Sequence, residues 1–512
     1  MEEMLALRLQ GVTKTFGSVI ANKNVDFDLR RGEILAVLGE NGSGKTTLMN
    51  MIAGIYYPDE GEIFVNGELA LIHTPKDAFS YGIGMIHQHF KLVDVFTASE
   101  NIILGVNNGK KYRLSEVNCE VAEIADKYGF HIVPEKKIYE MSVSEKQTVE
   151  IMKVLYRGAD ILILDEPTAV LTPQETEKLF AVLRRMRDDG KSIIIITHKM
   201  HEVLSISDRV AVLRRGEHIA TVNTADTNEN ELTELMIGKK VTLNIERAEP
   251  ENITPRLVVS DIFATNAEGV HTLKHISFTA NAGEILGIAG IAGSGQRELL
   301  EAIAGLYPLE NGDISYFAPE NGDKHDLRGM NPLQIRDLGV RLSFVPEDRL
   351  GMGLVGNMDI IDNMMLRSYT KGKSLFLDRE SPRHLADDII SSLEVVTPSA
   401  KTPVRRLSGG NVQKVLVGRE IAASPTVLMA AYPVRGLDIN SSYTIYNLLN
   451  AQKKKGVAVI FVGEDLDVLI ELCDRILVIN GGQITGIVDA RTTSREEVGL
   501  LMTKTMTEEA TQ

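Results

Sequence analysis

The stretch Gly39-Glu-Asn-Gly-Ser-Gly-Lys-Thr46 follows the apolar run Ile34–Leu38 and precedes Thr47–Ile52, which can open a helix. A glycine, four variable residues and then Gly-Lys-Thr, set between a strand and a helix, is typical of a loop that binds nucleotide phosphates. Its glycines let backbone N–H groups converge on phosphate oxygens, and the helix N-terminus adds its positive dipole end. We therefore expect a nucleoside triphosphate here, with Lys45 on its β- and γ-phosphates and the Thr46 hydroxyl on Mg²⁺.

Short apolar runs recur along the chain between helical stretches. Ile161–Leu164 and Ile193–Ile196 are two such runs, and Gln174–Arg187 lies between them with helical character. Unbroken apolar runs of this length are typical of parallel strands that are buried on both faces. Their alternation with helices predicts an α/β fold with a parallel-strand core.

Polar residues follow both of these runs. The carboxylates of Asp165 and Glu166 end the first run, and His198 follows the second. Because open α/β sheets bind ligands beyond the carboxyl ends of their strands, we expect these side chains to face the phosphate loop. Asp165 would then orient Mg²⁺, Glu166 would polarise the attacking water as a general base, and His198 would sense the terminal phosphate.

Composition and charge restrict the classes of protein to which the chain can belong. Of 512 residues, 44% are hydrophobic and 24% are charged, as in ordinary globular proteins, and the net charge of −15 argues against a nucleic-acid partner. We expect no signal peptide, and the longest apolar runs, such as Ile285–Ala292, are far shorter than the ~20 residues that span a bilayer. Cys119 and Cys473 have neither disulfide-framework nor zinc-site spacing.

The chain contains two copies of one unit. Arg31–Gly39 (RGEILAVLG) resembles Ala282–Gly290 (AGEILGIAG) about 250 residues later, and Asp208-Arg209 recurs as Asp474-Arg475. The second interval is longer by about 15 residues, which places an insertion in the middle of the second copy. We predict four segments: a first domain at 1–240, a charged, proline-containing linker at 241–255, a second domain at 256–505 and a polar tail at 506–512.

Further motifs resemble those of ABC transporter ATPases. Gln88, within Ile86-His-Gln-His-Phe90, is similar to the Q-loop of that family, and Leu407–Gln413 (LSGGNVQ) resembles its signature motif. The resemblance covers nearly the whole chain, and the tandem arrangement is similar to the fused ATPases of simple-sugar and nucleoside importers. It implies two fused P-loop nucleotide-binding domains, each with a helical subdomain that carries the signature, here roughly Thr97–Glu150 and its counterpart.

In this family the two domains pair head to tail, so each ATP lies between one P-loop and the opposite signature. The resemblance implies that the first composite site is complete. Its expected nucleotide contacts are Phe16 on the adenine, Gly39, Glu40, Asn41, Gly42, Ser43, Gly44, Lys45, Thr46 and Thr47 in the loop, and Ser408, Gly409, Gly410, Asn411 and Asp438 from the second half. Magnesium would be held by Thr46, Gln88 and Asp165, while Glu166, His198 and Gln88 would be catalytic.

The second composite site is expected to be degenerate. The replacements are Gln296 and Arg297 in the loop, Ala431, Tyr432 and Glu464 at the strand ends, and Val143 and Ser144 in place of the signature glycines. These losses come from both halves of the chain but fall on one composite site, which favours head-to-tail pairing. Without the lysine and the magnesium ligand, ordinary phosphoryl transfer is not expected there.

The resemblance also implies partners and a role. With ATP and Mg²⁺ as cofactors, the chain would energise import of nucleosides or a related simple sugar from the cytoplasmic face of the membrane, as a peripheral subunit. Two integral-membrane permease subunits and an extracytoplasmic substrate-binding lipoprotein would complete the transporter, and Phe90–Phe96 and Gly351–Met358 are candidate docking stretches. His87–Asp94 and Ser142–Glu150 look more like nucleoside-importer ATPases than ribose or galactose ones. A tandem ATPase acting on ribosomes or nucleic acid, and an exporter, remain as alternatives.

Overall fold

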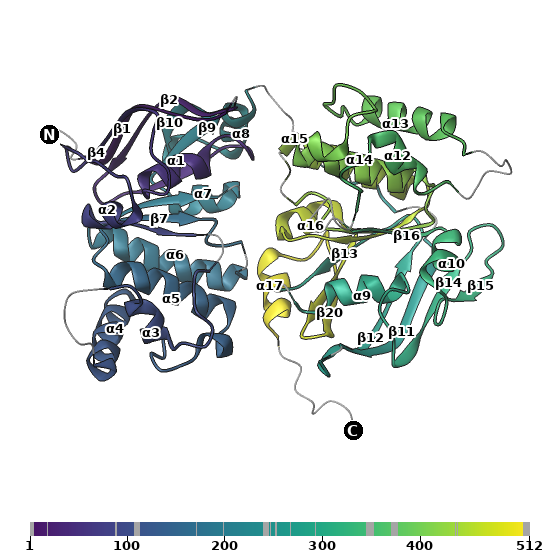
Figure 1. Cartoon of the computed structure of the whole chain (residues 1–512). Helices are drawn as coiled ribbons and strands as arrows, with labels where there is room; N and C mark the ends of the chain where they lie inside the picture. Colours follow the sequence, from purple (N-terminus) through teal and green to yellow (C-terminus); the bar gives the residue numbers. More distant parts are fainter. Residues whose placement is uncertain are drawn as a thin grey trace. The chain divides into compact units, whose positions relative to one another are not determined.

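The structure is a computed structural model in which the chain divides into two compact units, Met1–Leu243 (unit 1) and Asn244–Gln512 (unit 2) (Figure 1). The described residues are 5–17, 19–87, 90–106, 113–169, 171–197, 199–238, 245, 247–250, 253–266, 268–291, 293–344, 353–369, 377–435, 437 and 439–504. None of the helices within these ranges is long and apolar enough to cross a membrane.

The described residues of unit 1 form a six-stranded sheet in the order β10-β9-β3-β8-β7-β6. Its strands are β3 (Ile34–Leu38), β6 (Ile83–Ile86), β7 (Ile161–Asp165), β8 (Ser192–Ile196), β9 (Arg209–Arg214) and β10 (Glu217–Asn223). All neighbours are parallel except β9 and β10. In β8 the side chains of Ile193 and Ile195 pack in one core and those of Ile194 and Ile196 in another, so both faces of the sheet are buried. The predicted parallel core is confirmed.

A second, antiparallel sheet was not predicted. The described residues form it in the order β2-β1-β4-β5 from β1 (Leu5–Phe16), β2 (Val19–Arg30), β4 (Glu60–Val65) and β5 (Glu68–Leu69). Leu7 and Leu29 of this sheet share one core with Leu48 and Ile52 of α1 (Lys45–Ile52) and with Val37 of β3. The helix that follows the phosphate loop is therefore packed between two sheets.

The remaining helices of unit 1 are α2 (Pro75–Ser80), α3 (Ala98–Ile103), α4 (Leu114–Tyr128), α5 (Val143–Tyr156), α6 (Pro173–Asp188), α7 (Met200–Ile206) and α8 (Glu229–Ile237). Side chains of α3, α4, α5, α6 and α7 pack on the other face of the parallel sheet, whereas Ala78 of α2 lies in the core that holds α1. Ile102, Val121 and Ile151, from α3, α4 and α5, pack in the core that also holds Leu164 of β7. Together α3, α4 and α5 make the helical subdomain, at the bottom of unit 1 in Figure 1.

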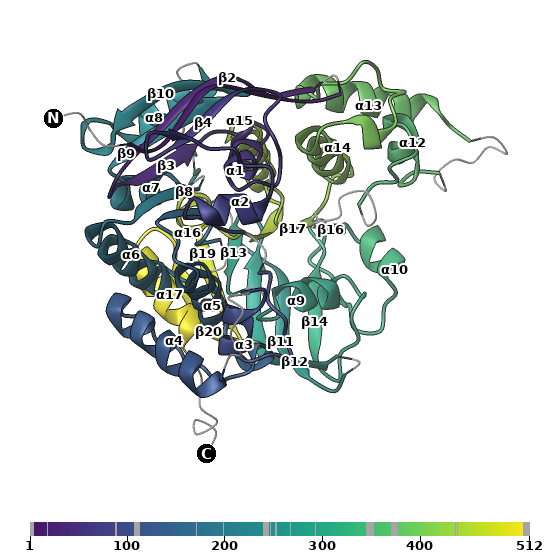
Figure 2. The same ribbon diagram turned by 60° about the vertical axis from the view of Figure 1, so that its left-hand side comes forward.

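Unit 2 repeats this plan. Its described strands form one sheet in the order β16-β17-β18-β13-β19-β20 and another in the order β12-β11-β14-β15. The strands are β11 (Pro255–Thr265), β12 (His271–Asn281), β13 (Ile285–Ala289), β14 (Asn311–Phe317), β15 (Lys324–Asp326), β16 (Val340–Phe344), β17 (Val427–Ala431), β18 (Ala458–Val462), β19 (Arg475–Asn480) and β20 (Gln483–Asp489). The helices are α9 (Gln296–Ile303), α10 (Pro332–Asp337), α12 (Ile360–Met365), α13 (Glu380–Ser392), α14 (Gly409–Ala422), α15 (Ile439–Lys454), α16 (Leu466–Leu472) and α17 (Arg495–Thr503). Figure 2 shows α12, α13 and α14 grouped beside the β16–β17 edge.

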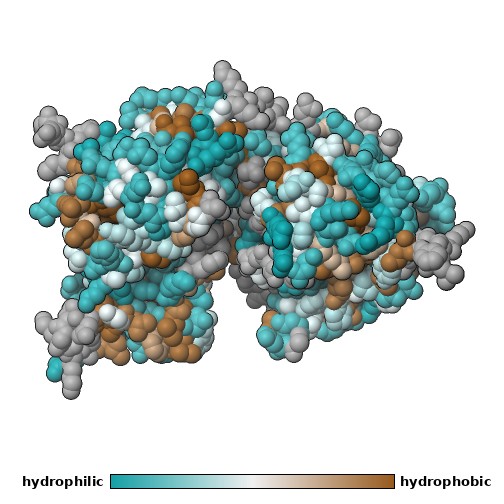
Figure 3. All heavy atoms as spheres, turned by 45° about the horizontal axis from the view of Figure 1, so that its top comes forward, coloured by the Kyte–Doolittle hydropathy of each residue, from teal (hydrophilic) through white to brown (hydrophobic). Residues whose placement is uncertain are grey.

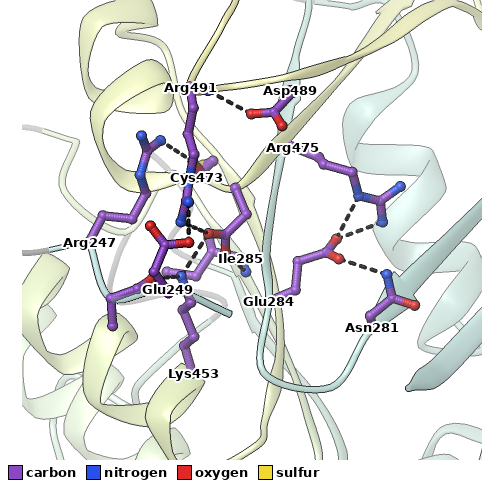
Figure 4. Close-up of polar contacts among 12 residues, drawn as sticks. Arg247, Glu249, Asn281, Glu284, Ile285, Lys453, Cys473, Arg475, Asp489 and Arg491 are labelled. Atoms are coloured by element: carbon purple, nitrogen blue, oxygen red, sulfur yellow. Dashed lines mark hydrogen bonds and ion pairs between the residues drawn. The ribbon is translucent and has the colours of Figure 1, made fainter. Parts of the chain in front are cut away.

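The repeated Asp-Arg pair ties β19 to the strand that carries the loop. The Asp474 carboxylate accepts the backbone N–H of Ile285 at 2.9 Å, and Arg475 pairs with Glu284 at 2.6 Å (Figure 4). Unit 1 has the same two contacts, Asp208 with the Ile34 N–H (2.8 Å) and Arg209 with Glu33 (2.8 Å). The duplicated dipeptide thus has a structural role in both units.

The described part of the segment predicted as a linker, 241–255, packs against unit 2. Ile245 is buried in the core of unit 2, and Arg247 donates to the Cys473 carbonyl at 2.6 Å. Lys453 donates to the Ala248 carbonyl, and Arg491 pairs with Glu249 (Figure 4). The described part of this charged segment is therefore bound to unit 2, because its side chains and carbonyls find buried partners there.

Candidate functional site

In the loop after β3, backbone carbonyls bind the side chain of Lys45. The Lys45 ammonium donates to the backbone carbonyls of Gly39 at 2.7 Å and Glu40 at 3.0 Å. Burial lowers the pKa of Lys45, while the carboxylates of Glu166 and Asp165 act to raise it. The ammonium therefore lies inside the loop and within the electrostatic reach of both acids.

Glycines are required at particular positions of this loop. A Cβ on Gly39 would stand 2.4 Å from the Leu213 carbonyl oxygen, and one on Gly44 would stand 2.4 Å from the Ala21 carbonyl oxygen. Gly44 also has a φ of 95° and begins α1 without a side-chain cap. The first N–H groups of α1 thus have no capping side chain, which leaves them available to an anion.

The two acids lie at the carboxyl end of β7, two strands from β3. Burial, reinforced by the neighbouring charge of Glu166 and opposed by Lys45, raises the pKa of Asp165 to about 6. Glu166 has a φ of 47°, unusual for a residue with a side chain, and its N–H donates to the Ile196 carbonyl of β8 at 2.9 Å. The sheet therefore brings Lys45, Asp165 and Glu166 together at one edge, although Lys45 is distant from the two acids in the sequence.

Phe16 lies at the end of β1 with 43% of its surface exposed. Its ring meets that of Tyr56 edge to face at 5.2 Å, and the Lys14 ammonium lies 5.7 Å from its centroid. The adjoining strand β2 contributes the Ala21 carbonyl that a Cβ at Gly44 would meet. Phe16 is thus an exposed aromatic ring on the sheet that borders the phosphate loop.

Three predicted site residues lie outside the described residues: Gln88, His198 and Asp438. On either side of His198, the Thr197 hydroxyl and the Lys199 ammonium both contact Glu202, at 3.3 and 3.1 Å. Thr168, three residues from Asp165, also donates to Glu202, at 2.6 Å. This buried glutamate, which no sequence motif marks, links the ends of β7 and β8.

The loop of unit 2 keeps its shape but not its charge. Gln296 is buried, and its amide donates to the Ile291 carbonyl at 3.0 Å, the counterpart of the contact between Lys45 and Glu40. Gly295 keeps a left-handed φ of 108° at the start of α9. Arg297 pairs with Glu301 at 2.7 Å, one turn along the helix. A neutral amide therefore replaces the ammonium, and the hydroxyl at the next position is lost.

Other side chains fill the place of the unit 1 acids. Tyr432 has a φ of 50°, and its N–H donates to Val462 as that of Glu166 does to Ile196, while Ala431 before it is buried. Burial, with Glu464, raises the pKa of the Tyr432 hydroxyl, which stays neutral. Arg435 lies 6.0 Å above the Tyr432 ring and pairs with Glu464 at 3.2 Å. Unit 2 therefore keeps the backbone conformation that unit 1 has at this strand end, but it has neither of the two carboxylates.

The two signature segments differ at their helix starts. Ser142 caps α5, because its hydroxyl accepts the N–H of Glu145 at 3.2 Å and the Glu145 carboxylate accepts the N–H of Ser142 at 2.7 Å. In unit 2 the Ser408 hydroxyl bonds to Asn411 at 2.8 Å instead, and α14 has neither a side-chain cap nor an acid in its first turn. The start of α14 is open to an anion, whereas a carboxylate occupies the start of α5.

Val143 and Ser144 occupy the first turn of α5, where α14 has Gly409 and Gly410. Burial acts to raise the pKa of Glu145 in that turn, but hydrogen bonds from Lys136 and Ser142 hold it below its usual value. Glu145 is therefore a charged group that would repel a phosphate. The Ser-x-x-Glu spacing of a capping box was the sequence signal for it.

Comparisons with known proteins agree with this arrangement. The family model described as ABC transporter matches residues 22–169 and 273–433, once in each unit. The chain is 41% identical over 507 residues to the nucleoside import ATP-binding protein NupA of Lactococcus lactis, covering 98% of this chain and 99% of that one. It is 41% identical over 509 residues to the guanosine import ATP-binding protein NupO of Bacillus subtilis, covering 98% of each.

More distant relatives carry other names. The ribose import ATP-binding protein RbsA 1 of Streptomyces avermitilis is 36% identical, covering 98% of this chain and 94% of that one. Among solved structures, an ATP-binding cassette of an ABC transporter in its ADP conformation is 25% identical with a TM-score of 0.42, covering 46% of this chain and 100% of that chain.

Proposed function

Because the chain belongs to the ABC transporter family, we propose that it is the ATP-hydrolysing subunit of an importer for nucleosides, with a related simple sugar as the second candidate cargo. The grouping of Lys45, Asp165 and Glu166 at one sheet edge carries the enzymatic part of this proposal. The relatives named for nucleoside and guanosine import, each 41% identical, support the cargo. The relative named for ribose import is 36% identical, which keeps a sugar as the alternative.

The chemistry follows from the side chains of unit 1. Lys45 and the open N–H groups of α1 would bind the β- and γ-phosphates, and Glu166 would accept the proton of the attacking water. Magnesium fits the donors present, because the Thr46 hydroxyl and the Asp165 carboxylate are the hard oxygen ligands it prefers. When bound, the ion would neutralise charge on the phosphates. Gln88 and His198 keep the roles proposed for them from the family pattern.

We also propose that only one composite site hydrolyses ATP. The open start of α14, with Ser408, Gly409 and Gly410, suits the γ-phosphate of a nucleotide held by the unit 1 loop. The opposite combination pairs Gln296 with a signature whose Glu145 carboxylate already occupies the helix start. Charge and hydrogen bonding therefore oppose phosphoryl transfer at the second site. Its glycines could still bind a nucleotide without hydrolysing it.

The partners would be two integral-membrane permease subunits and an extracytoplasmic substrate-binding lipoprotein, with this chain on the cytoplasmic face. The candidate docking stretches are built alike. Asn101 forms two hydrogen bonds with the backbone of Val93. Its Oδ1 accepts the Val93 N–H at 2.7 Å, and its Nδ2 donates to the Val93 carbonyl at 3.1 Å. Asn363 holds Val355 in the same way, at 2.8 and 3.1 Å. The side chain of Val355 is 42% exposed, and Val95 in the first stretch is 65% exposed. These supported, apolar loops are suitable surfaces for a permease helix.

The proposal is tested with the complete transporter in vesicles. We expect ATP-dependent uptake of labelled guanosine to exceed that of labelled ribose, and uptake to stop when Lys45→Ala replaces the native chain. Arg383→Gln, an exposed change on α13 outside the predicted site residues, is the matched control and should leave uptake unchanged. Uptake of ribose but not of any nucleoside would reassign the cargo. Uptake that persists in Lys45→Ala would contradict the enzymatic assignment.

A further inference from the structure

Polar side chains form a buried cluster where β7 and β8 end. Its members are Thr168, Thr197, Lys199 and Glu202, the last from α7, and together they are named the Glu202 cluster. The Glu202 carboxylate, 1% exposed, accepts the hydroxyl of Thr168 at 2.6 Å and that of Thr197 at 3.3 Å. Its other oxygen lies 3.1 Å from the Lys199 ammonium, which also donates to the Thr168 carbonyl at 3.2 Å. The cluster thus supplies partners for a carboxylate that is hidden from water.

Such a cluster is unusual inside a protein. Hydrophilic side chains make up most of the face that Figure 3 shows, with small apolar patches between them. A charged side chain in the interior loses its hydration, and this loss can exceed the attraction to its partner. Apolar side chains of similar volume often fill the same space without any loss of stability. The fold alone therefore does not favour a glutamate at position 202.

Unit 2 builds the same corner from other side chains. The spacing that relates Asp208 to Asp474 places these residues at the four positions of the cluster: Val434, Gly463, Asp465 and Val468. The two valines pack against the apolar core that holds Phe461. A Cβ at Gly463 would lie 2.7 Å from a ring carbon of Phe461, so no side chain fits there. Asp465 accepts the N–H of Asp467 at 2.9 Å and caps α16. The corner is therefore largely apolar in unit 2.

The backbone of the corner is the same in both units. In unit 1 the N–H of Ala169 donates to the Glu166 carbonyl at 3.2 Å, which closes the turn that Glu166 begins. In unit 2 the N–H of Arg435 donates to the Tyr432 carbonyl at the same distance. Glu166 and Tyr432 have left-handed φ values of 47° and 50°. Because this turn forms with valines in place of Thr168 and Glu202, its backbone does not require the cluster.

The cluster does add a second attachment between the turn and β8. The first attachment is the Glu166 N–H, which donates to the Ile196 carbonyl at 2.9 Å in both senses a backbone contact that unit 2 shares. The second runs from the Thr168 hydroxyl through Glu202 to the Thr197 hydroxyl, next to Ile196. Directional hydrogen bonds fix a position more tightly than apolar contacts do. The turn that carries Glu166 is therefore held more precisely than its counterpart in unit 2.

We propose that Glu202 is a positioning residue for ATP hydrolysis. Through Thr168 it fixes the turn that carries Glu166, and so sets where the Glu166 carboxylate stands relative to the attacking water. The inference rests on the proposed function, in which Glu166 accepts the proton of that water. Unit 2 needs no such residue, because Tyr432 replaces the base. Glu202 acts through the turn and not on the water itself.

Two changes at Thr168 test the hydrogen bond against simple packing. Thr168→Val keeps the shape of the side chain and removes the hydroxyl, whereas Thr168→Ser keeps the hydroxyl and removes the methyl group. In the complete transporter, Thr168→Val should lower kcat by about 10- to 100-fold, as expected for a displaced catalytic group. Binding of labelled ATP and the KM for ATP should not change, and Thr168→Ser should stay close to the native kcat.

Thr233→Val is the matched control. Thr233 is a threonine of α8 that is 1% exposed, and its hydroxyl donates to the Glu229 carbonyl at 2.7 Å. The change removes a buried hydroxyl of the same kind and should leave kcat unchanged. A loss of activity in Thr168→Ser as large as that in Thr168→Val would make Thr168 a packing residue and contradict the inference. Weakened ATP binding in Thr168→Val, in proportion to the loss of kcat, would contradict it too.

A double variant guards against misfolding, because Thr168→Val leaves Glu202 with one partner fewer. Thr168→Val combined with Glu202→Val copies the pair of valines that unit 2 already folds with. Its unfolding temperature should equal or exceed that of the native chain, while kcat stays as low as in Thr168→Val. A native kcat in this double variant would overturn the inference alone, provided that Glu166→Gln is inactive. If Glu166→Gln also hydrolysed ATP at the native rate, the proposed base itself would be wrong.

Discussion

The backbone N–H of Ser142 donates to the Glu145 carboxylate at 2.7 Å, and the N–H of Glu145 donates back to the Ser142 hydroxyl at 3.2 Å. In this reciprocal cap the protein's own side chains bind the N–H groups at the start of α5 that could otherwise bind an anion. In unit 2 the equivalent Ser408 hydroxyl bonds to a side chain, Asn411, so the N–H groups at the start of α14 remain for a ligand. Two segments at the same place in the repeat thus have opposite properties.

The first prediction concerns these two serines. Ser408→Arg should lower the ATPase rate about as severely as Lys45→Ala, on the order of 10²-fold or more, because it blocks the only uncapped signature. Ser142→Arg should lower the rate less than about threefold while destabilising α5 by ~1 kcal/mol through loss of its cap. Steady-state ATPase assays with the permease complex, alongside thermal unfolding, measure both. Equal inactivation by the two changes would mean that both signatures are used.

The second prediction compares the two loops. Lys45→Ala should abolish turnover, since it removes the ammonium that lies inside the unit 1 loop. Gln296→Ala should keep most of the activity, because a neutral amide bonded to the Ile291 carbonyl contributes no charge to phosphate. The check is the ATPase rate at saturating Mg-ATP, with circular dichroism to confirm folding. A large loss in Gln296→Ala would show that the second loop takes part in hydrolysis.

The third prediction separates binding from chemistry. Glu166→Gln should retain nucleotide binding and lower the hydrolysis rate by about 10²–10⁴-fold, the contribution expected of a general base. Tyr432→Phe is the matched change in unit 2 and should have little effect, because burial keeps that hydroxyl neutral. Filter binding of labelled ATP and single-turnover hydrolysis distinguish the two steps. If Glu166→Gln hydrolysed ATP at the native rate, another group would have to be the base.

The fourth prediction is the effect of removing the metal. Chelation with EDTA should stop hydrolysis, and adding Mg²⁺ should restore it. In Thr46→Ala the Mg²⁺ concentration needed for half-maximal activity should rise, because one oxygen ligand is lost. Arg297→Ala, at the equivalent position of α9, should leave that concentration unchanged. A magnesium titration of the ATPase rate in all three proteins provides the measurement.

The fifth prediction concerns the buried ion pair of unit 2. Lys453 and Asp474 lie 2.7 Å apart with side chains 1% and 6% exposed. Asp474→Ala should lower the free energy of unfolding by about 3–5 kcal/mol, because it leaves a buried ammonium unpaired. Glu217→Ala breaks the exposed pair with Lys23 and should change it by less than about 1 kcal/mol. Urea denaturation, followed separately for the two units, would reveal the difference, and similar effects of both changes would contradict it.

Much of the fold follows from short stretches of sequence. The run Ile34–Leu38 is β3 residue for residue, and Ile161–Leu164 lies within β7, because strands buried on both faces need unbroken apolar side chains. The antiparallel sheet was missed because its long strands are only partly buried, although Asn66-Gly67 marks the turn between β4 and β5. The packing of Ile245 and Arg247 on unit 2 was missed because their partners lie far along the chain.

By itself the sequence determined the duplication, through two similar segments about 250 residues apart, and predicted the phosphate loop and a degenerate second site. The loop could be predicted because its residues are neighbours in the chain, where spacing alone sets geometry. The closed start of α5, which Glu145 caps, is a local feature that the Ser-x-x-Glu spacing already indicated. Only the tertiary structure brought Arg341 and Arg419 to one cavity, since they lie on a strand and a helix far apart in the sequence. Such a cavity forms only when distant segments of the chain pack together.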